Sequence, residues 1–156
     1  MTTAFLPGSF DPPTNGHVDV LRRAMKVFDR VVIGVVDNPN KSGLFSVAER
    51  VALLAAIAKD GADVVSFNGL VVRAAEKVGA DVMVKGVRDT TDVAYETQFA
   101  LMNRHLTGIE TVLLPADPAS SFVSSSLVKE IWKLGSDVSS LVPEQVLAAL
   151  EGKEPS

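Results

Sequence analysis

The sequence predicts an α/β fold in which a parallel sheet of five strands carries helices on both faces. Short apolar runs alternate with segments of helical periodicity over nearly all of the 156 residues. Neighbouring parallel strands need such crossover connections, which are right-handed. The length suits one packed core and is too short for two ordinary domains. We therefore expect a single doubly wound, Rossmann-like domain over residues 1–151 and a loose polar tail over residues 152–156.

Five short apolar runs predict the strands. The expected strands are residues 2–6, 31–36, 64–67, 82–84 and 111–114. Neither the dinucleotide fingerprint G-x-G-x-x-G nor the P-loop motif occurs in the sequence. Their absence removes the two commonest phosphate-binding motifs of such a sheet.

Apolar residues at helical spacing and capping signals predict the helices between the strands. Ser46 and Glu49 form a capping box, and Gly61 stops the helix that they open. Asp92 is expected to cap a longer helix, and Pro143 stands where proline is tolerated in a first helical turn. The expected helices are residues 18–28, 46–60, 70–78, 92–106, 124–134 and 143–151.

The most informative segment joins the first strand to the first helix and reads Pro-Gly-Ser-Phe-Asp-Pro-Pro-Thr-Asn-Gly-His over residues 7–17. A strand that turns into a helix points the first N–H groups and the positive dipole end of the helix beyond the sheet edge, which favours anion binding. His17 falls in the first helical turn, where its ring can reach the same anion, and Gly16 leaves room for a ligand. The alternative is that Thr14 or Asn15 merely caps the helix and His17 is a surface residue.

Polar and cationic residues follow the other strands at the same edge, where ligands of such sheets bind. Lys41 lies in the loop after the second strand, and Lys85 and Arg88 follow the fourth. After the fifth strand, Ser124 to Ser126 open a helix, so that hydroxyls and backbone N–H groups can hold phosphate together. Taken alone, these serines fit equally well as a helix cap followed by a solvated Lys129. Together with the first motif they predict a phosphate-binding edge.

Composition and charge exclude several classes of protein. The chain has no cysteine, which excludes disulfides and thiolate zinc sites and suits a cytoplasmic enzyme. The formal net charge of -4 argues against a broad basic surface for nucleic acid. There is no apolar run of about 18 residues and no basic stretch leading into an apolar segment at the start, so neither a membrane span nor a signal peptide is expected.

Two motifs resemble those of the nucleotidyltransferase superfamily, whose members transfer a nucleotidyl group from a nucleoside triphosphate and release pyrophosphate. Residues 8–17 resemble its T/H-x-G-H signature, and residues 123–129 resemble its second signature, Ile-Ser-Ser-Thr-x-x-Arg. Val123, Ser126 and Lys129 depart from the second signature, and lysine keeps the charge of arginine without its bidentate fork. Within the superfamily the chain is most similar to the bacterial phosphopantetheine adenylyltransferases.

The likeness to that family runs from Ala4 to about Leu150 and includes the block from Lys85 to Arg104, which looks specific to it. It implies transfer of the adenylyl group of ATP to 4'-phosphopantetheine, which gives dephospho-coenzyme A and pyrophosphate in coenzyme A biosynthesis. The acceptor phosphate is already ionised near neutral pH, so in-line attack needs no protein base and no covalent intermediate with the enzyme.

The resemblance also assigns roles to single residues. It implies that His17 stabilises the transition state by donating a hydrogen bond to the α-phosphate, with Lys41 and Arg88 as further catalytic residues. The residues implied to bind phosphopantetheine are Ser9, Lys41, Val71 and Lys85. The residues implied to bind ATP are Ser9, Phe10, His17, Gly86, Val87, Arg88, Glu96, Ser120, Ser121, Phe122, Val123, Ser124, Ser125 and Ser126. Mg²⁺ is expected to arrive on the triphosphate, with no metal ligand from protein side chains.

Further expectations concern partners and assembly. Tyr95, Phe99, Met102 and Leu106 recur at helical spacing, and we interpret this stripe as packing against the core or a neighbouring subunit. The family resemblance implies a cytoplasmic homohexamer built as a dimer of trimers, with coenzyme A as a feedback inhibitor and with no nucleic-acid or membrane partner.

Two alternative functions stay open at this point. One is a nicotinate-mononucleotide adenylyltransferase, a cytidylyltransferase or another small-molecule nucleotidyltransferase of the superfamily. The other is a nucleotide-binding sensor without catalysis. Lys41 and the block from Lys85 to Arg104 favour the pantetheine branch. His17 argues against a sensor, which has no need for a donor at the α-phosphate.

Overall fold

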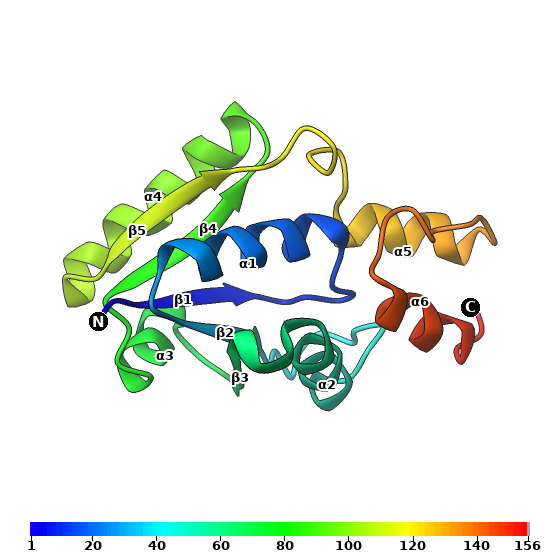
Figure 1. Cartoon of the computed structure of the whole chain (residues 1–156), viewed down its shortest axis with the longest axis horizontal. Helices are drawn as coiled ribbons and strands as arrows, with labels where there is room; N and C mark the ends of the chain where they lie inside the picture. Colours follow the sequence, from blue (N-terminus) through cyan, green and yellow to red (C-terminus); the bar gives the residue numbers. More distant parts are fainter. Residues whose placement is uncertain (156) are drawn as a thin grey trace.

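The computed structural model describes residues 1–155 and contains one parallel sheet with the strand order β3-β2-β1-β4-β5 (Figure 1). The strands are β1 (Thr3–Gly8), β2 (Arg30–Val36), β3 (Asp63–Phe67), β4 (Val82–Val87) and β5 (Glu110–Pro115). The predicted fold class is thereby confirmed. The order reverses at β1, with β2 and β3 on one side and β4 and β5 on the other, and ligands of such sheets bind outside the carboxyl ends at this reversal.

Helices cover both faces of the sheet and its carboxyl end. The helices are α1 (Asn15–Val27), α2 (Val47–Ala58), α3 (Val71–Lys77), α4 (Thr90–Thr107), α5 (Ser125–Lys133) and α6 (Glu144–Glu151), with a short 3-10 turn at Lys59–Gly61. Helices α1 and α2 pack on one face, and α3 packs on the other. Helices α5 and α6 lie beyond the arrowhead of β1 (Figure 1).

Alternation along the central strands divides the core into two layers, because successive strand side chains point to opposite faces. Leu6 and Ile33 belong to the layer beneath α1 and α2. Phe5 and Val32, each the neighbour of one of these residues, belong to the layer beneath α3. A third apolar cluster, which includes the buried Phe45, joins α5 and α6 to α2. This third cluster holds α5, which follows the predicted serine-rich segment, against the rest of the domain.

Most element boundaries differ from the predicted ones by one to three residues, and three of these differences have a clear cause. Strand β4 continues through Lys85 and Gly86, which pair with β5, because the backbone ladder extends beyond the last apolar side chain. Asp89, not Asp92, caps α4, and its carboxylate accepts a hydrogen bond from the Asp92 N–H at 2.8 Å. Pro143 is the N-cap of α6 and lies just before its first turn.

The segment after α6 makes specific contacts with the body of the domain. Lys153 forms an ion pair with Glu49 at 3.3 Å, and its ammonium lies 4.9 Å from the centroid of the Phe45 ring. Both partners belong to the start of α2 or the residues just before it. Ser156, the last residue of the segment for which we expect a loose tail, lies outside the described residues.

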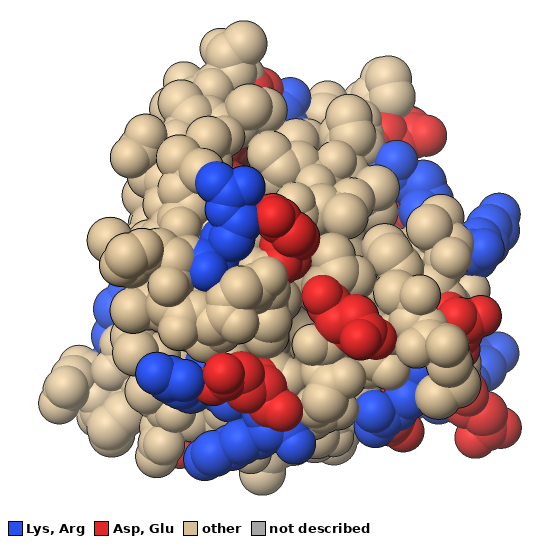
Figure 2. Space-filling model, turned by 90° about the vertical axis from the view of Figure 1, so that its left-hand side faces the viewer, with Lys and Arg blue, Asp and Glu red and all other residues tan. Residues whose placement is uncertain are grey.

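The surface near the amino ends of the strands mixes charges of both signs. Figure 2 shows this face, on which lysine and arginine side chains lie beside aspartate and glutamate side chains with uncharged surface between them. Within residues 1–155, no helix is both long and apolar enough to cross a membrane.

Candidate active site

Two adjoining cavities open at the carboxyl ends of β1 and β4, where the strand order reverses. The α1 cavity, of about 360 Å³, is bounded by the start of α1, the end of β4 and the segment before α5. The α4 cavity, of about 440 Å³, lies between β1, the start of α3 and the inner side of α4. Both are lined by Pro7, Gly8, Ser9, Lys85 and Glu96, which therefore form the boundary between them.

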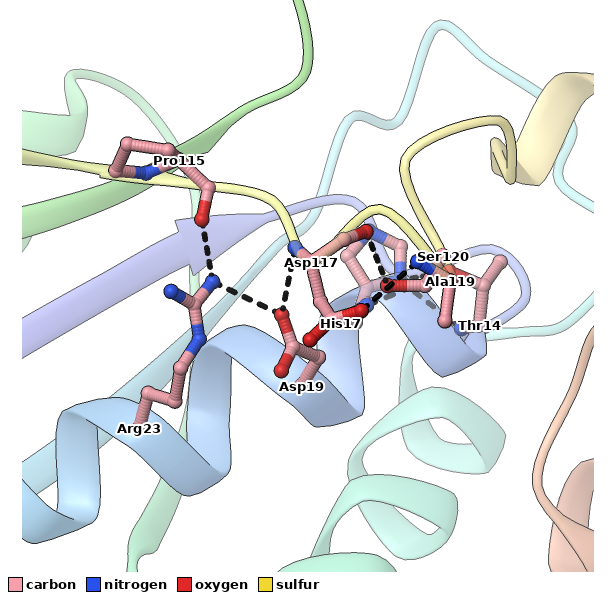
Figure 3. Close-up of polar contacts among 8 residues, drawn as sticks. All are labelled: Thr14, His17, Asp19, Arg23, Pro115, Asp117, Ala119 and Ser120. Atoms are coloured by element: carbon pink, nitrogen blue, oxygen red, sulfur yellow. Dashed lines mark hydrogen bonds and ion pairs between the residues drawn. The ribbon is translucent and has the colours of Figure 1, made fainter.

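His17 is held in the first turn of α1 by Thr14, the N-cap residue (Figure 3). The backbone N–H of Thr14 donates a hydrogen bond to Nδ1 of His17 at 3.0 Å. In return, the His17 N–H donates to the Thr14 hydroxyl at 3.4 Å. Since Nδ1 is an acceptor, the proton of the neutral ring belongs on Nε2. His17 thus offers an N–H donor from the wall of the α1 cavity.

The ring of His17 stays neutral at physiological pH. Burial of the ring lowers its pKa from 6.5 to about 4, and the positive charges of Lys85 and Arg88 add to this effect. Phe10 contributes to the burial, because its ring meets the imidazole edge-on with the centroids 4.9 Å apart. A neutral imidazole can donate one hydrogen bond to a phosphate oxygen without giving up its proton.

The turn before α1 is strained at Phe10. This residue has a φ of 50°, in the left-handed region that bulky side chains rarely adopt. Backbone outliers of this kind persist only where the surrounding structure holds them, and they concentrate at functional sites. Here the strained conformation accompanies the packing of the buried Phe10 ring against His17.

Two cations reach the site from the end of β4, and each is paired with a carboxylate of α4. Lys85 lies 3.3 Å from Glu96, at the boundary of the two cavities. Arg88 lies 3.2 Å from Asp92, and its backbone N–H donates to the same carboxylate at 2.9 Å. In this part of the cavity wall, each of the two cations is paired with one carboxylate. Each cation can bind a phosphate group in place of its carboxylate.

The serine-rich segment before α5 completes the α1 cavity. Ser124 caps α5 and accepts a hydrogen bond from the Leu127 N–H at 3.2 Å. The Ser125 hydroxyl donates to the carbonyl of Pro12 at 2.8 Å, which joins α5 to the turn before α1. The N-termini of α1 and α5 therefore border one cavity, as the sequence predicts for a phosphate-binding edge.

The structure brings most of the sequence-predicted residues to these cavities. The α1 cavity is lined by Ser9, Phe10, His17, Lys85, Gly86, Arg88, Glu96, Ser120, Val123, Ser124 and Ser125. The α4 cavity is lined by Ser9, Val71, Lys85 and Glu96, together with the stripe of Tyr95, Phe99, Met102 and Leu106 on α4. The residues placed outside both linings are Lys41, Val87, Ser121, Phe122 and Ser126.

Lys41 lies in an exposed loop that two buried charged side chains hold in place. Arg50 donates from Nη1 to the carbonyls of Ser9 and Val36, at 2.6 and 3.1 Å. It thereby joins the end of β2, where this loop starts, to the turn between β1 and α1. The Asp11 carboxylate accepts the N–H groups of Leu44 and Phe45, both at 2.8 Å, at the other end of the loop. The loop that carries Lys41 is fixed at both ends beside Ser9.

Lys129 contacts Asp11 and not the α1 cavity. Its ammonium lies 3.5 Å from the Asp11 carboxylate. Lys129 also lines a separate open groove, together with Ser126, Lys133 and Lys153. The lysine that stands at the signature position of arginine thus supports the turn before α1.

Two residues have roles at the site that the sequence analysis did not predict. Thr14 orients His17 as well as capping α1, and the spacing of three residues between them is the signal for a capping box. Asp92, predicted as a helix cap, instead binds Arg88 at the cavity wall. The i,i+4 spacing of Arg88 and Asp92 is the available signal for that pair.

Within the described residues, no group of three or more His, Cys, Asp or Glu side chains could hold a metal ion. The cavities are lined by hydroxyls, by the cations Lys85 and Arg88, and by the carboxylates Asp92 and Glu96, each of which is paired with one of these cations. The residues present do not fit a resident metal.

The chain matches the cytidylyltransferase-like family over residues 5–131. It is 47% identical to a phosphopantetheine adenylyltransferase of Alkaliphilus metalliredigens, with 98% of this chain and 99% of the relative covered. It is 49% identical to a phosphopantetheine adenylyltransferase of Rhizobium rhizogenes, with 98% of this chain and 96% of the relative covered.

A solved structure from Vibrio parahaemolyticus, provisionally named a nicotinate-nucleotide adenylyltransferase, has a TM-score of 0.68 and 18% identity. The match covers 97% of this chain and 93% of that chain. At this identity the likeness shows the fold alone.

Proposed function

Because this chain belongs to the cytidylyltransferase-like family and, within it, to the phosphopantetheine adenylyltransferases, we propose that it transfers the adenylyl group of ATP to 4'-phosphopantetheine. The products are dephospho-coenzyme A and pyrophosphate, and the reaction is a step of coenzyme A biosynthesis. A phosphate oxygen of the acceptor attacks the α-phosphorus in line. The bond from that phosphorus to the pyrophosphate breaks, and no covalent intermediate with the enzyme forms.

The observation that carries the proposal is the meeting of two cavities at Ser9, Lys85 and Glu96. A transfer between two bound molecules needs their reacting ends at one point, and most of the gain in rate then comes from placement. The α1 cavity, with two helix N-termini and Arg88, suits the phosphates of ATP. The α4 cavity, lined by Val71 and apolar side chains of α4, suits the uncharged pantetheine arm.

His17 supplies charge stabilisation at the α-phosphate in this mechanism. Negative charge accumulates on the oxygens of the α-phosphate as the new bond forms, and a fixed N–H donor stabilises it. The neutral ring, with Nδ1 held by Thr14, keeps its Nε2 proton in the right place for this task. The ring acts as a hydrogen-bond donor throughout and neither gains nor loses a proton.

The remaining predicted residues divide between the two substrates. Ser9, Lys41, Val71 and Lys85 hold 4'-phosphopantetheine, with Lys85 released from Glu96 as the acceptor phosphate binds. The group proposed to hold ATP comprises Ser9, Phe10, His17, Gly86, Val87, Arg88, Glu96 and residues 120–126. Mg²⁺ enters with the triphosphate as part of the nucleotide substrate.

The exposed side of α4 and the two cavities also bear on assembly and regulation. We propose a cytoplasmic homohexamer, a dimer of trimers, in which exposed apolar side chains of α4 that do not line the α4 cavity are buried between subunits. These side chains include Val93 and Leu101. We also propose feedback inhibition by coenzyme A, which carries both an adenylate and a pantetheine arm and so can span both cavities.

A single assay tests the reaction against its alternatives. The protein is incubated with ATP and Mg²⁺ and with each of three acceptors: 4'-phosphopantetheine, nicotinate mononucleotide and a phosphorylated amino alcohol with CTP in place of ATP. We expect pyrophosphate release with 4'-phosphopantetheine. Release with another acceptor alone would assign the chain to another branch of the superfamily. No release with any acceptor, despite ATP binding, would support a sensor.

A further inference from the structure

Helix α1 carries an ion pair on the turn that follows His17. Asp19 and Arg23 stand at the i,i+4 spacing, and Arg23 Nη2 lies 2.9 Å from the Asp19 carboxylate (Figure 3). The same nitrogen donates to the carbonyl of Pro115 at 2.6 Å, and the Asp117 N–H donates to the Asp19 carboxylate at 3.3 Å. The pair thus fastens the end of β5 and the start of the following loop to α1.

The loop fastened in this way leads directly into the α1 cavity. The carbonyl of Asp117 accepts the Ser120 N–H at 2.9 Å, and the carbonyl of Ser120 accepts the Val123 N–H at 3.1 Å. The Asp117 carboxylate accepts the Ala119 N–H at 2.8 Å. Ser120 is buried, and both Ser120 and Val123 line the cavity. A chain of hydrogen bonds therefore connects the ion pair to the serine segment that faces His17.

The loop faces the first turn of α1 across a narrow gap. A methyl group at Gly16, in the first turn of α1, would lie 3.6 Å from the carbonyl of Ser120 and 3.8 Å from that of Val123. The start of α1 and the serine segment are therefore separated by about the width of one methyl group. A shift of the loop against α1 changes the shape of the cavity between them.

Stability alone does not explain the ion pair. Its side chains are 36% exposed at Arg23 and 23% exposed at Asp19, and partly exposed pairs contribute little to folding. The Arg23 Nε is buried without a hydrogen-bond partner among residues 1–155, which opposes stability. What the pair does achieve is a fixed distance between α1 and the loop, which is the requirement for a preorganised phosphate site.

We propose that Asp19 and Arg23 are positioning residues that set the affinity for the triphosphate of ATP. They hold the segment from Asp117 to Ser124 against the N-terminus of α1 and touch no substrate themselves. The assignment of ATP as the ligand rests on the proposed function. The acceptor, which binds in the α4 cavity, does not depend on this loop.

The test compares R23Q with R30Q, a matched control. Arg30 pairs with Asp63 at 2.8 Å and donates to the carbonyl of Val78 at 3.2 Å, so it makes the same two kinds of contact at the other end of the sheet. The Kd for ATP is measured by calorimetry without acceptor, and steady-state kinetics with both substrates gives kcat and the two KM values. Amide hydrogen exchange at Asp117 and Ser120 reports how often the hydrogen bonds that hold the loop open.

In R23Q we expect the Kd and KM for ATP to rise about tenfold, because the serine segment is no longer held at the N-terminus of α1. The acceptor KM stays unchanged, exchange at Asp117 and Ser120 is faster, and R30Q behaves like the wild type. R23K restores part of the affinity, because an ammonium can still donate to Pro115 and Asp19. If R23Q does not fold, D19N provides the same comparison with a nearly isosteric side chain.

Equal ATP affinity in R23Q, D19N and R30Q would overturn the positioning role, as would an equal loss for ATP and acceptor. The proposed function fails separately, if the wild type binds ATP and releases no pyrophosphate with 4'-phosphopantetheine. In that case the calorimetric comparison of R23Q with R30Q still decides the role of the pair. A wild type that binds no ATP would overturn both proposals.

Discussion

The backbone N–H of Thr14 donates to Nδ1 of His17, so the contact that begins α1 also fixes which nitrogen of the imidazole bears the proton. One residue serves both as a helix cap and as an orienting group for the proposed donor. The N-cap of α1 and the protonation of the imidazole are therefore determined by the same pair of residues, Thr14 and His17.

Replacing His17 with alanine should remove the donor to the α-phosphate. We expect turnover to fall by about a hundred- to a thousandfold, or about 3–4 kcal/mol, as for the loss of one preorganised donor. Steady-state kinetics measures the effect, and circular dichroism checks that the fold is retained. His105→Ala, at an exposed position in the last turn of α4, is the matched control. Near-normal turnover in the His17 variant would refute the role.

The lowered pKa of His17 predicts a pH dependence of stability. The folded-state pKa of about 4 lies below the 6.5 of the free ring, so the unfolded state binds the proton more tightly between these values. The free energy of unfolding should be constant above pH 6.5 and fall by up to roughly 3 kcal/mol in total as the pH drops to about 4. Denaturant titrations of wild type and His17→Ala measure the difference. A difference that does not vary with pH would contradict the pKa shift.

Lys41→Ala should weaken binding of the acceptor, because the loop that carries the lysine is fixed beside Ser9. We expect the acceptor KM to rise by about tenfold or more, which corresponds to one lost charged contact of about 1.5–3 kcal/mol. The Kd for ATP should stay the same. Lys77→Ala, at the exposed end of α3, controls for the change in net charge. Unchanged acceptor kinetics in the Lys41 variant would exclude the assigned role.

The capping box of α2 should contribute to stability without affecting catalysis. The Ser46 hydroxyl accepts the Glu49 N–H at 3.1 Å, and the Ser46 N–H donates to the Glu49 carboxylate at 2.7 Å. Ser46→Ala should therefore lower the free energy of unfolding by about 1 kcal/mol. Thermal and denaturant unfolding give the cost, and the turnover number should match that of the wild type. An unchanged melting temperature would show that the box contributes nothing.

The proposed subunit interface can be tested at Leu101, which is 49% exposed on α4 and lies outside both cavity linings. A buried, unpaired carboxylate is costly, so Leu101→Glu should shift the assembly toward smaller species. Sedimentation velocity measures the shift. Leu134→Glu, at a leucine that is 80% exposed beyond α5, should leave the assembly unchanged. A wild type that sediments as a monomer would refute the hexamer itself.

The alternation of apolar runs and helical patterns was enough to predict the sheet and its helices. Local signals were accurate where a single residue could fill a role, as for the capping box of Ser46 and Glu49. They were wrong where two residues competed for a role. Asp89 and Asp92 can each cap a helix, and the contact of Asp92 with Arg88, four residues before it, decides between them.

The candidate site was predictable as an edge but not as two cavities. Strand ends placed Ser9, Lys85 and the serine segment together, because parallel strands end at the same edge. The pairing of Lys85 with Glu96 and of Lys129 with Asp11 depends on side-chain directions that no linear pattern contains. The catalytic and binding roles of these residues stay predictions.

The common boundary at Ser9, Lys85 and Glu96 has a consequence for inhibitor chemistry. Two fragments that occupy the two cavities separately could be joined by a short linker across this boundary. Binding of one half would then present the other at an effective concentration in the millimolar range, so that the affinity of the joined molecule could exceed that of either half by about two to four orders of magnitude. The same continuity makes a single long ligand a stronger competitor than either substrate alone.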